Sequence, residues 1–282
     1  MQTGPLLFHR YSLPLVLASL RLDLEYAKRG YARYAAYPTA AFAGLFTNTV
    51  FGFMRAFVLL ALFAGRDEVG GYDRSAAITY VWLTQGLVAT IYIWGWQDLS
   101  LRIRTGDIAT DLIRPVHPLR AGLAFDLGRS LYHAALRGTP PAVVGGIVFG
   151  LTLPSDPLVW LAFTVSVFLA VVVSYAYRAL YNIAAFWLTD WRGALLIAIT
   201  AANFFSGFVV PVRFFPAPLE AFARATPFPS MVQVPIDIFV GRAAGAELAL
   251  AVASQLGWAL VLLALAAWLF DRGVRRLVVQ GG

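Results

Sequence analysis

Long apolar stretches alternate with short polar ones through the whole chain. A helix of about 20 apolar residues crosses the roughly 30 Å hydrocarbon layer of a membrane. By that measure the sequence predicts six membrane-spanning helices, over residues 38–64, 75–97, 131–153, 157–188, 193–212 and 246–270. The pattern therefore predicts an all-α polytopic membrane protein.

We expect the chain to form a single transmembrane domain over residues 1–282. Residues 1–37 form an N-terminal cytoplasmic elbow segment, residues 38–270 the six-helix membrane domain, and residues 271–282 a cytoplasmic tail. The polar turn at 154–157 (PSDP) separates the third and fourth spans, because lipid offers no hydrogen-bond partners to the backbone of a turn.

The segment before the first span has the pattern of an amphipathic helix. Apolar residues recur at steps of three, four or seven, which places them on one helical face; they are Leu13, Leu17, Leu20, Leu24 and Tyr31. Basic residues flank this stripe, as in helices that lie on a membrane surface. The alternative is a disordered or cleaved leader.

The region 213–240 is apolar but carries five prolines, at 216, 218, 227, 229 and 235. Proline removes a backbone donor and so does not fit a continuous span. We expect short re-entrant helices before the sixth span, one of them supported by an i,i+4 pair of Glu220 and Arg224. The alternative is a plain loop outside the membrane.

Composition supports a membrane protein and gives its orientation. Mean hydropathy is +0.71 and only 13% of residues are charged, about half the share in a soluble domain. With the N-terminus in the cytoplasm, the inner segments hold 14 Lys and Arg residues and the outer segments hold 5. The positive-inside rule then predicts a multi-pass protein of the cell (inner or plasma) membrane with both termini cytoplasmic.

Several kinds of chemistry are absent from the sequence. It has no G-x-x-x-x-G-K-[ST] phosphate loop, no G-x-S-x-G elbow and no cysteine, and its three histidines lack metal-ligand spacing. The arginines lie between apolar spans rather than on one basic face, which argues against nucleic-acid binding. We expect no catalytic residues, no metal and no cofactor in this chain.

Few charges lie near the expected spans, and the acidic ones lie at span ends. This disfavours an ion-coupled carrier, which needs acidic residues near the membrane centre. Arg137 and Arg178 lie a turn or two from the cytoplasmic ends, so we expect their long side chains to snorkel to the headgroups. The alternative is a substrate path, for which the candidates are Arg55, Arg178, Tyr181 and Asn182.

The polar stretch RTGDIATDLIRPVHP, residues 104–118, lies between the second and third spans. Asp107 and Asp111 are spaced i,i+4 on a short helix that begins after Gly106, and Pro115 ends it. A short polar helix held between two rigid spans can dock a cytoplasmic partner and transmit its motion. The alternative is a solvated connecting loop.

Three segments carry a family resemblance: DLSLRIRTGDIATDLIRPVHPLRAGLAFDLGR, SGFVVPVRFFPAPLEAFARATPFPSMVQVPIDIFVGR and the ending RRLVVQGG. Nearly the whole chain resembles bacterial ATP-binding-cassette (ABC) exporter permeases of type 2, in the viologen-exporter-like branch. The resemblance implies a six-helix half-transporter with an elbow helix, a coupling helix and re-entrant helices.

The resemblance also implies partners. Such permeases work as dimers on two ABC ATPase subunits, which bind ATP and Mg, and a heterodimer of two permeases is favoured over a homodimer. The coupling role maps onto Arg104, Gly106, Asp107, Asp111, Arg114 and Pro115. The substrate is not specified by the sequence. An ion-coupled secondary transporter and a non-transport membrane scaffold remain as alternatives.

Overall fold

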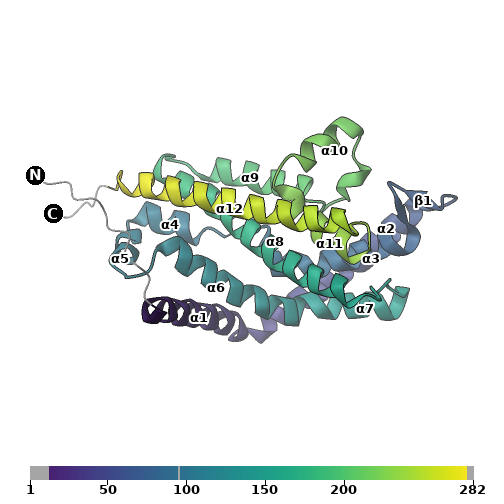
Figure 1. Cartoon of the computed structure of the whole chain (residues 1–282), viewed down its shortest axis with the longest axis horizontal. Coiled ribbons are helices and arrows are strands. Elements are labelled where there is room, and N and C mark those ends of the chain that lie inside the picture. The colour runs from purple at the N-terminus through teal and green to yellow at the C-terminus, as the bar shows by residue number, and fades with distance from the viewer. Residues whose placement is uncertain (1–12, 95, 278–282) are drawn as a thin grey trace, which may run out of the picture.

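The computed structural model describes residues 13–94 and 96–277, and these are mostly helical. Figure 1 shows an elongated bundle whose main helices run along its long axis. The short helix α5 (Ile108–Leu112) and the C-terminal end of α12 (Ala246–Val274) lie at one end. A small β-hairpin, β1 (Glu68–Val69) and β2 (Tyr72–Asp73), lies at the other end. This antiparallel hairpin, with Glu68 opposite Asp73, is the one departure from the all-α prediction in the described part of the chain.

Three helices in the described residues are long and apolar enough to cross a membrane: Pro38–Leu62, Pro157–Phe186 and Ala246–Val274. The first is α2 and the third is α12. The second consists of α8 (Pro157–Ile183) and the 3₁₀ turn η3 (Ala184–Phe186). They coincide with the first, fourth and sixth predicted spans. Proline in the first turn favours the starts of α2 and α8, and the Asp156 carboxylate caps α8 by accepting a hydrogen bond of 2.8 Å from the Leu158 backbone N–H. The turn predicted at 154–157 therefore lies where α8 begins.

The predicted boundaries of the other three spans are wrong. The second is shortened to α3 (Arg74–Leu87) and the π-helical turn η1 (Val88–Tyr92), because Tyr92 takes a positive φ of 59° and ends the helix. The fifth is shortened to α9 (Arg192–Phe205), which ends before Gly207 at a φ of +87°.

The third predicted span is the second half of a longer helical stretch. It consists of α6 (Pro118–His133), the π-helical turn η2 (Ala134–Gly138) and α7 (Thr139–Phe149). Pro118 begins it, and the His117 side chain accepts a hydrogen bond of 3.2 Å from the Leu119 N–H. Residues 118–130, predicted as part of a cytoplasmic segment, are therefore a rigid helix packed inside the protein.

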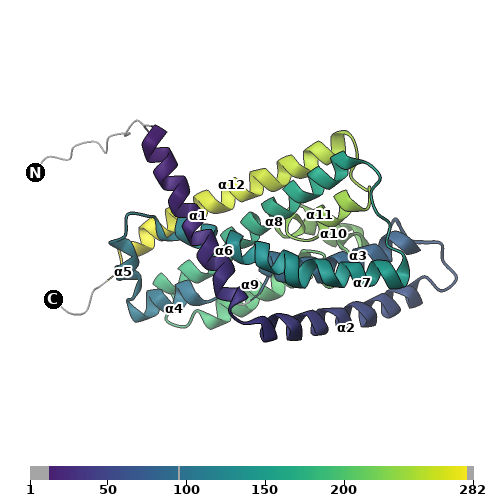
Figure 2. The same cartoon turned by 90° about the horizontal axis from the view of Figure 1, so that it is seen from below.

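The helix α1 (Leu13–Ala35) crosses α6 diagonally (Figure 2). The crossing depends on two glycines. A Cβ on Gly30 would lie 2.0 Å from the Phe125 carbonyl oxygen, and a Cβ on Gly128 would lie 1.8 Å from that of Ala27. Leu20 and Leu24 stay exposed, so the bundle leaves part of the apolar stripe of α1 uncovered. Residues 1–12 of the predicted elbow segment and 278–282 of the predicted tail lie outside the described residues.

The proline-rich region forms short helices, as predicted. They are η4 (Val212–Phe214), α10 (Ala217–Arg224), η5 (Phe228–Ser230) and α11 (Gln233–Phe239). Glu220 and Arg224 form the predicted ion pair, at 2.7 Å. Ile236 and Ile238 of α11 are fully buried, so α11 belongs to the core.

A buried polar network joins these short helices to α3 and the β-hairpin. The Gln233 side chain accepts hydrogen bonds from the Tyr80 hydroxyl, at 2.9 Å, and from the Val212 N–H, at 2.8 Å. It donates to the Tyr72 hydroxyl, at 2.7 Å, and to Asp237, at 2.9 Å. One amide therefore links four segments of this end of the molecule.

Candidate functional site

The segment predicted to dock a partner is a hairpin of two short helices at the end of the bundle. The helix α4 (Asp98–Thr105) ends at Gly106, whose φ of 82° is the left-handed conformation that glycine adopts at low cost. The Asp107 carboxylate accepts a hydrogen bond of 2.7 Å from the Thr105 hydroxyl, and α5 follows. The sequence predicted the start of this helix correctly, while α5 ends at Leu112, before Pro115.

Asp111 points into the hairpin rather than toward solvent. Its carboxylate lies 2.6 Å from Nη2 of Arg102 on α4 and 3.6 Å from Nη1 of Arg114, and the residue is buried. The i,i+4 pair of Asp107 and Asp111 therefore does not form a single acidic face. Asp107 is exposed, whereas Asp111 links α4 to the segment after α5 through its ion pairs.

The tip of the hairpin presents a small amphipathic surface. Arg104, Gly106, Asp107, Arg114 and Pro115 are exposed. Beside them Ile113 is 85% exposed, which is high for a large apolar side chain. The sequence analysis did not identify Ile113 as part of this surface. The pattern that could have indicated it is an apolar residue at the end of a short polar helix, directly before Arg114 and Pro115.

The hairpin is fixed to α8 by the side chain of Asn182. The Asn182 amide oxygen accepts a hydrogen bond of 3.0 Å from the Ser100 N–H. Its amide nitrogen donates to the carbonyls of Trp96, at 2.9 Å, and Arg178, at 2.7 Å. Because Asn182 is fully buried, these bonds are shielded from water. They attach the start of α4 to α8.

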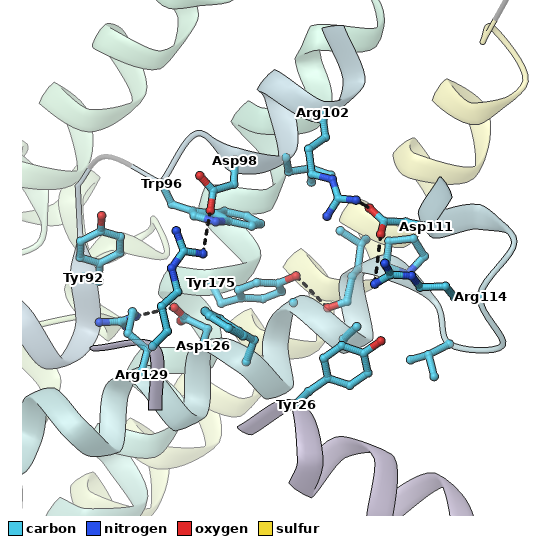
Figure 3. Close-up of a pocket in the computed structure, with 18 of the residues that line it drawn as sticks. Tyr26, Tyr92, Trp96, Asp98, Arg102, Asp111, Arg114, Asp126, Arg129 and Tyr175 are labelled. Carbon is cyan, nitrogen blue, oxygen red and sulfur yellow. Dashed lines mark hydrogen bonds and ion pairs between the residues drawn. The ribbon is translucent and has the colours of Figure 1, made fainter. Parts of the chain in front are cut away.

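A cavity of about 220 Å³ lies behind the hairpin, between α1, α4, α6 and α8 (Figure 3). Its charged lining residues are Arg33, Asp98, Arg102, Asp111, Arg114, Asp126 and Arg129, and its aromatic ones include Tyr26, Tyr34, Tyr92, Trp96 and Tyr175. The acidic groups face arginines: besides the Asp111 pairs, Arg33 lies 3.7 Å from Asp98. The cavity thus combines apolar and aromatic walls with charges that are largely balanced.

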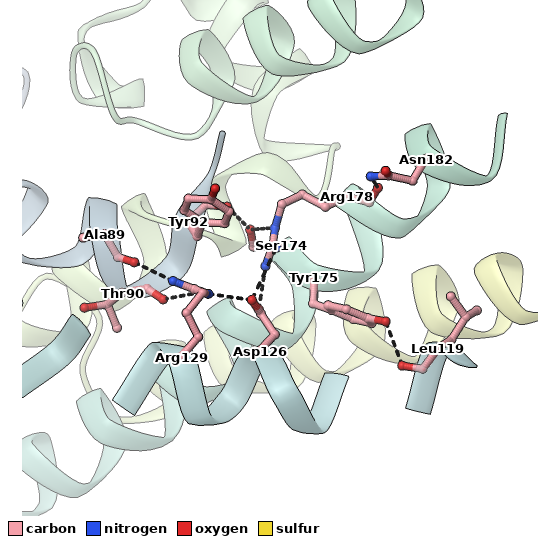
Figure 4. Close-up of polar contacts among 10 residues, drawn as sticks. All are labelled: Ala89, Thr90, Tyr92, Leu119, Asp126, Arg129, Ser174, Tyr175, Arg178 and Asn182. Carbon is pink, nitrogen blue, oxygen red and sulfur yellow. Dashed lines mark hydrogen bonds and ion pairs between the residues drawn. The ribbon is translucent and has the colours of Figure 1, made fainter. Parts of the chain in front are cut away.

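Figure 4 shows a buried ionic network, two of whose residues, Asp126 and Arg129, line this cavity. Asp126 on α6 accepts hydrogen bonds of 2.6 Å from Nε of Arg129 and 2.6 Å from Nη2 of Arg178. Arg129 also donates to the carbonyls of Ala89, at 2.8 Å, and Thr90, at 3.0 Å. Burial raises the pKa of Asp126, but the guanidinium groups of Arg178 and Arg129 outweigh it and hold the pKa below its usual value. The network therefore joins α6, α8 and the turn η1 through ionised groups.

Tyr92 lies within this network. Its ring centroid is 4.6 Å from Cζ of Arg129 and 5.3 Å from Cζ of Arg178, so both cations are close enough for cation–π attraction. Its positive φ is unusual for a bulky residue, and such outliers gather at functional sites.

The prediction that Arg178 snorkels to the headgroups is wrong. The residue is 1% exposed, because Asp126 offers an internal counter-ion that the sequence placed in a cytoplasmic loop. The i,i+3 spacing of Asp126 and Arg129 was the available signal.

The other candidate path residues lie in two places. Tyr181 is on α8 with Arg178 and Asn182, and its buried hydroxyl has no hydrogen-bond partner in the described residues. Arg55 is on α2 and donates to the carbonyls of Phe208 and, at 2.9 Å, Val209. The described contacts join Arg178 to Asn182 and leave Arg55 in a separate cluster.

Among the described residues, no group of three or more His, Cys, Asp or Glu side chains is arranged to hold a metal ion.

Comparison with known protein families gives one decisive match. The model of the ABC-2 family transporter protein matches residues 49–281, which is most of the chain. The chain belongs to this ABC-2 transporter family. Searches of curated proteins and of solved structures gave no match.

Family membership identifies the chain as a transmembrane permease component of ABC transporters. The match covers the α4–α5 hairpin, the Asp126 network and the short helices before α12. Members of the family associate with ABC ATPase partners.

Proposed function

We propose that this chain is the permease subunit of an ABC exporter of the viologen-exporter-like branch. In this proposal two permeases form the substrate path and two ATPase subunits, which bind ATP and Mg, drive it. The observation that carries the proposal is the exposed tip of the α4–α5 hairpin, which the Asn182 hydrogen bonds tie to α8.

The proposed orientation has six spans, with both termini and the hairpin in the cytoplasm. Three of the six spans meet the length and composition expected of a membrane helix. The hairpin and the β-hairpin lie at opposite ends of the bundle (Figure 1). The arginine bias agrees with an inner location of the α4–α5 end.

The hairpin tip is proposed to seat in a cleft of the ATPase subunit. Ile113 supplies an apolar anchor, and Arg104, Asp107 and Arg114 supply charges around it, which is the usual arrangement of an interface hot spot. Gly106 ends α4, and Pro115 lies in the segment that follows α5. Asp111 contributes from inside, because it holds Arg102 and Arg114 in place.

Motion of the ATPase is proposed to reach the membrane domain through α8. Asn182 and Arg178 are one turn apart on this helix, and they contact α4 and Asp126 respectively. A displacement of the hairpin then acts on α6 and α8 together. In this proposal Arg178 and Asn182 position the path, and Arg55 and Tyr181 are the candidates for contact with substrate.

The substrate class proposed is an amphipathic or lipid-like molecule. The interior offers apolar walls, and its buried Arg178 and Arg129 share the carboxylate of Asp126 as their counter-ion. A heterodimer of two unlike permeases is favoured over a homodimer by the branch resemblance alone.

The test is pull-down of the ATPase subunit by the detergent-solubilised permease, with coupled ATP turnover measured alongside. Asp107→Arg should weaken binding about tenfold or more, because a charged hydrogen bond across an interface is worth about 1.5–3 kcal/mol. Ile113→Ser should weaken binding without changing any charge. Asp67→Arg in the outer loop is the matched control and should leave binding unchanged.

If Asp107→Arg, Arg114→Glu and Ile113→Ser all bind the ATPase as wild type does, the docking assignment is wrong. Transport that runs on an ion gradient without ATP would instead support a secondary transporter. The pull-down does not depend on knowing the substrate.

A further inference from the structure

A second cavity lies on the other side of Tyr92, at the junction of α1 and α2. Its volume is about 270 Å³. Its polar and aromatic lining residues are Tyr34, Tyr37, Asn48, Tyr92, Trp94, Tyr132, His133 and Arg137. Among the residues that the structure describes, no acidic one lines it, in contrast to the cavity behind the hairpin.

Two polar groups of this cavity lack partners. His133 is 6% exposed, and its Nδ1 atom has no hydrogen-bond partner among the described residues. Arg137, four residues later, has a buried Nε atom that also lacks a hydrogen-bond partner among the described residues. A buried polar group without a partner is costly, and a charged one more so. The two side chains therefore call for a ligand that accepts hydrogen bonds and carries negative charge.

The Arg137 guanidinium is held in place by α2. A Cβ added to Gly44 would lie 2.3 Å from Cζ of Arg137, so the guanidinium lies directly against the glycine backbone. The His133 ring packs edge-on against Tyr34, with a centroid distance of 4.8 Å. Both side chains are thus packed against neighbouring helices at the wall of the cavity.

The position and size of the cavity indicate the kind of ligand. Tyr34 and Tyr37 flank the turn between α1 and the first span, which the proposed orientation places at the level of the inner headgroups. A volume of about 270 Å³ is at the lower limit of small-molecule pockets. It suits a headgroup, with the acyl chains outside along the exposed apolar face of α2, where Phe42 and Phe46 lie.

We propose that this cavity binds the phosphate group of an anionic membrane lipid from the inner leaflet, with Arg137 and His133 as its ligands. Basic pockets between membrane helices on the cytoplasmic side recognise lipid headgroups in this way. The inference uses the membrane orientation of the proposed function, but it does not depend on ATPase coupling.

The test is titration of the purified full-length protein in neutral detergent, read by native mass spectrometry. Three probes separate the contributions: dioleoylphosphatidylglycerol, dioleoylglycerol, which has the same chains without phosphate, and glycerol 1-phosphate, which has phosphate without chains. We expect strong binding of the first alone. No ATPase is present, so failure here is distinguishable from failure of the docking assignment.

Arg137→Gln should weaken phosphatidylglycerol binding about tenfold or more, since it removes a charged hydrogen bond. Arg137→Lys keeps the charge and should retain most of the binding. His133→Phe keeps the ring packing and should give an intermediate loss. Arg192→Gln changes an exposed arginine that does not line the cavity. It is the matched control and should change binding less than twofold.

Equal losses in Arg137→Gln and Arg192→Gln would show general attraction of anionic lipid and overturn the site. Binding of dioleoylglycerol as tight as that of phosphatidylglycerol would also overturn it. Glycerol 1-phosphate binding as tightly as the lipid would overturn the lipid assignment. If Arg137→Gln does not fold, the probe series on the wild type and on His133→Phe still decides the question.

Discussion

The carboxylate of Asp126 on α6 accepts a hydrogen bond of 2.6 Å from Nη2 of Arg178 on α8, and both residues are buried. Removing one member of a buried ion pair leaves an uncompensated charge, which destabilises a protein by about 3–5 kcal/mol. Asp126 is shared with Arg129, so the two ends of the pair are not equivalent.

We expect Asp126→Ala to be more destabilising than Arg178→Leu. The first leaves two buried guanidinium groups without a counter-ion, while the second leaves Asp126 still paired with Arg129. Arg178→Lys should also lower stability, because one ammonium group cannot replace the contacts to Asp126 and Ser174. Apparent melting temperatures in detergent measure all three. A stable Arg178→Lys protein with full transport would show that the guanidinium contacts of Arg178 are not needed.

The crossing of α1 and α6 should fail when a side chain is added at Gly128. Leucine there would collide with the Ala27 carbonyl, and overpacking of this kind costs about 1–3 kcal/mol. We expect α1 to separate from α6. The measurement is cross-linking of cysteines placed at Asp23 and Arg120, whose side chains lie 2.6 Å apart, by a short bifunctional maleimide. Gly257→Leu on α12, where nothing lies within 4 Å, should cross-link as efficiently as the parent.

Gln233→Leu should destabilise the end of the molecule that carries the β-hairpin. The change keeps the volume but leaves the Val212 N–H without its acceptor, and a buried group left unpaired costs about 1–3 kcal/mol. The Tyr80 hydroxyl keeps its hydrogen bond to the Gly207 carbonyl. Proteolysis of the segment between α9 and α12 should therefore become faster. Glu247→Gln, which is exposed, serves as the control. Equal cleavage rates for both variants would mean that the network adds no stability.

Single cysteines should report the orientation directly, because the chain has none of its own. Positions 70, 110, 155 and 225 are all exposed in the structure. We expect an impermeant thiol reagent to label positions 70, 155 and 225 in intact cells, and to label position 110 only after lysis. Labelling of position 110 in intact cells would reverse the proposed orientation.

The helical membrane fold and the polar hairpin were predictable because each depends on local signals. Runs of apolar residues, the prolines at 38 and 157 and the glycine at 106 determine where elements begin and end. The start of the helix at Pro118 was missed because the segment that follows it is polar enough to resemble a loop. Its polar residues are buried by pairing with other helices, which a single sequence does not reveal.

The candidate site was predictable in outline but not in its internal pairing. The sequence identified Asp107, Asp111 and Arg114, yet it gave no means to see that Asp111 turns inward to Arg102. It gave the opposite interpretation for Arg178, since an arginine near a helix end has the same local pattern whether it faces headgroups or Asp126. Charge pairs between distant segments are a tertiary property.

The π-helical turns η1 and η2 fix the angular phase of the segments that follow them. The helix α3, which precedes η1, touches η2 beside these turns. There a Cβ on Gly86 would lie 2.7 Å from the Gly138 carbonyl oxygen. A π turn carries one residue more than an α turn, and each residue of an α-helix turns the chain by about 100°. Deleting one residue within Val88–Tyr92 would therefore restore regular helix geometry while rotating Trp94 away from its hydrogen bond to Asn203. The number of residues in each turn thus determines which side chains meet after it, as the identities of those side chains do.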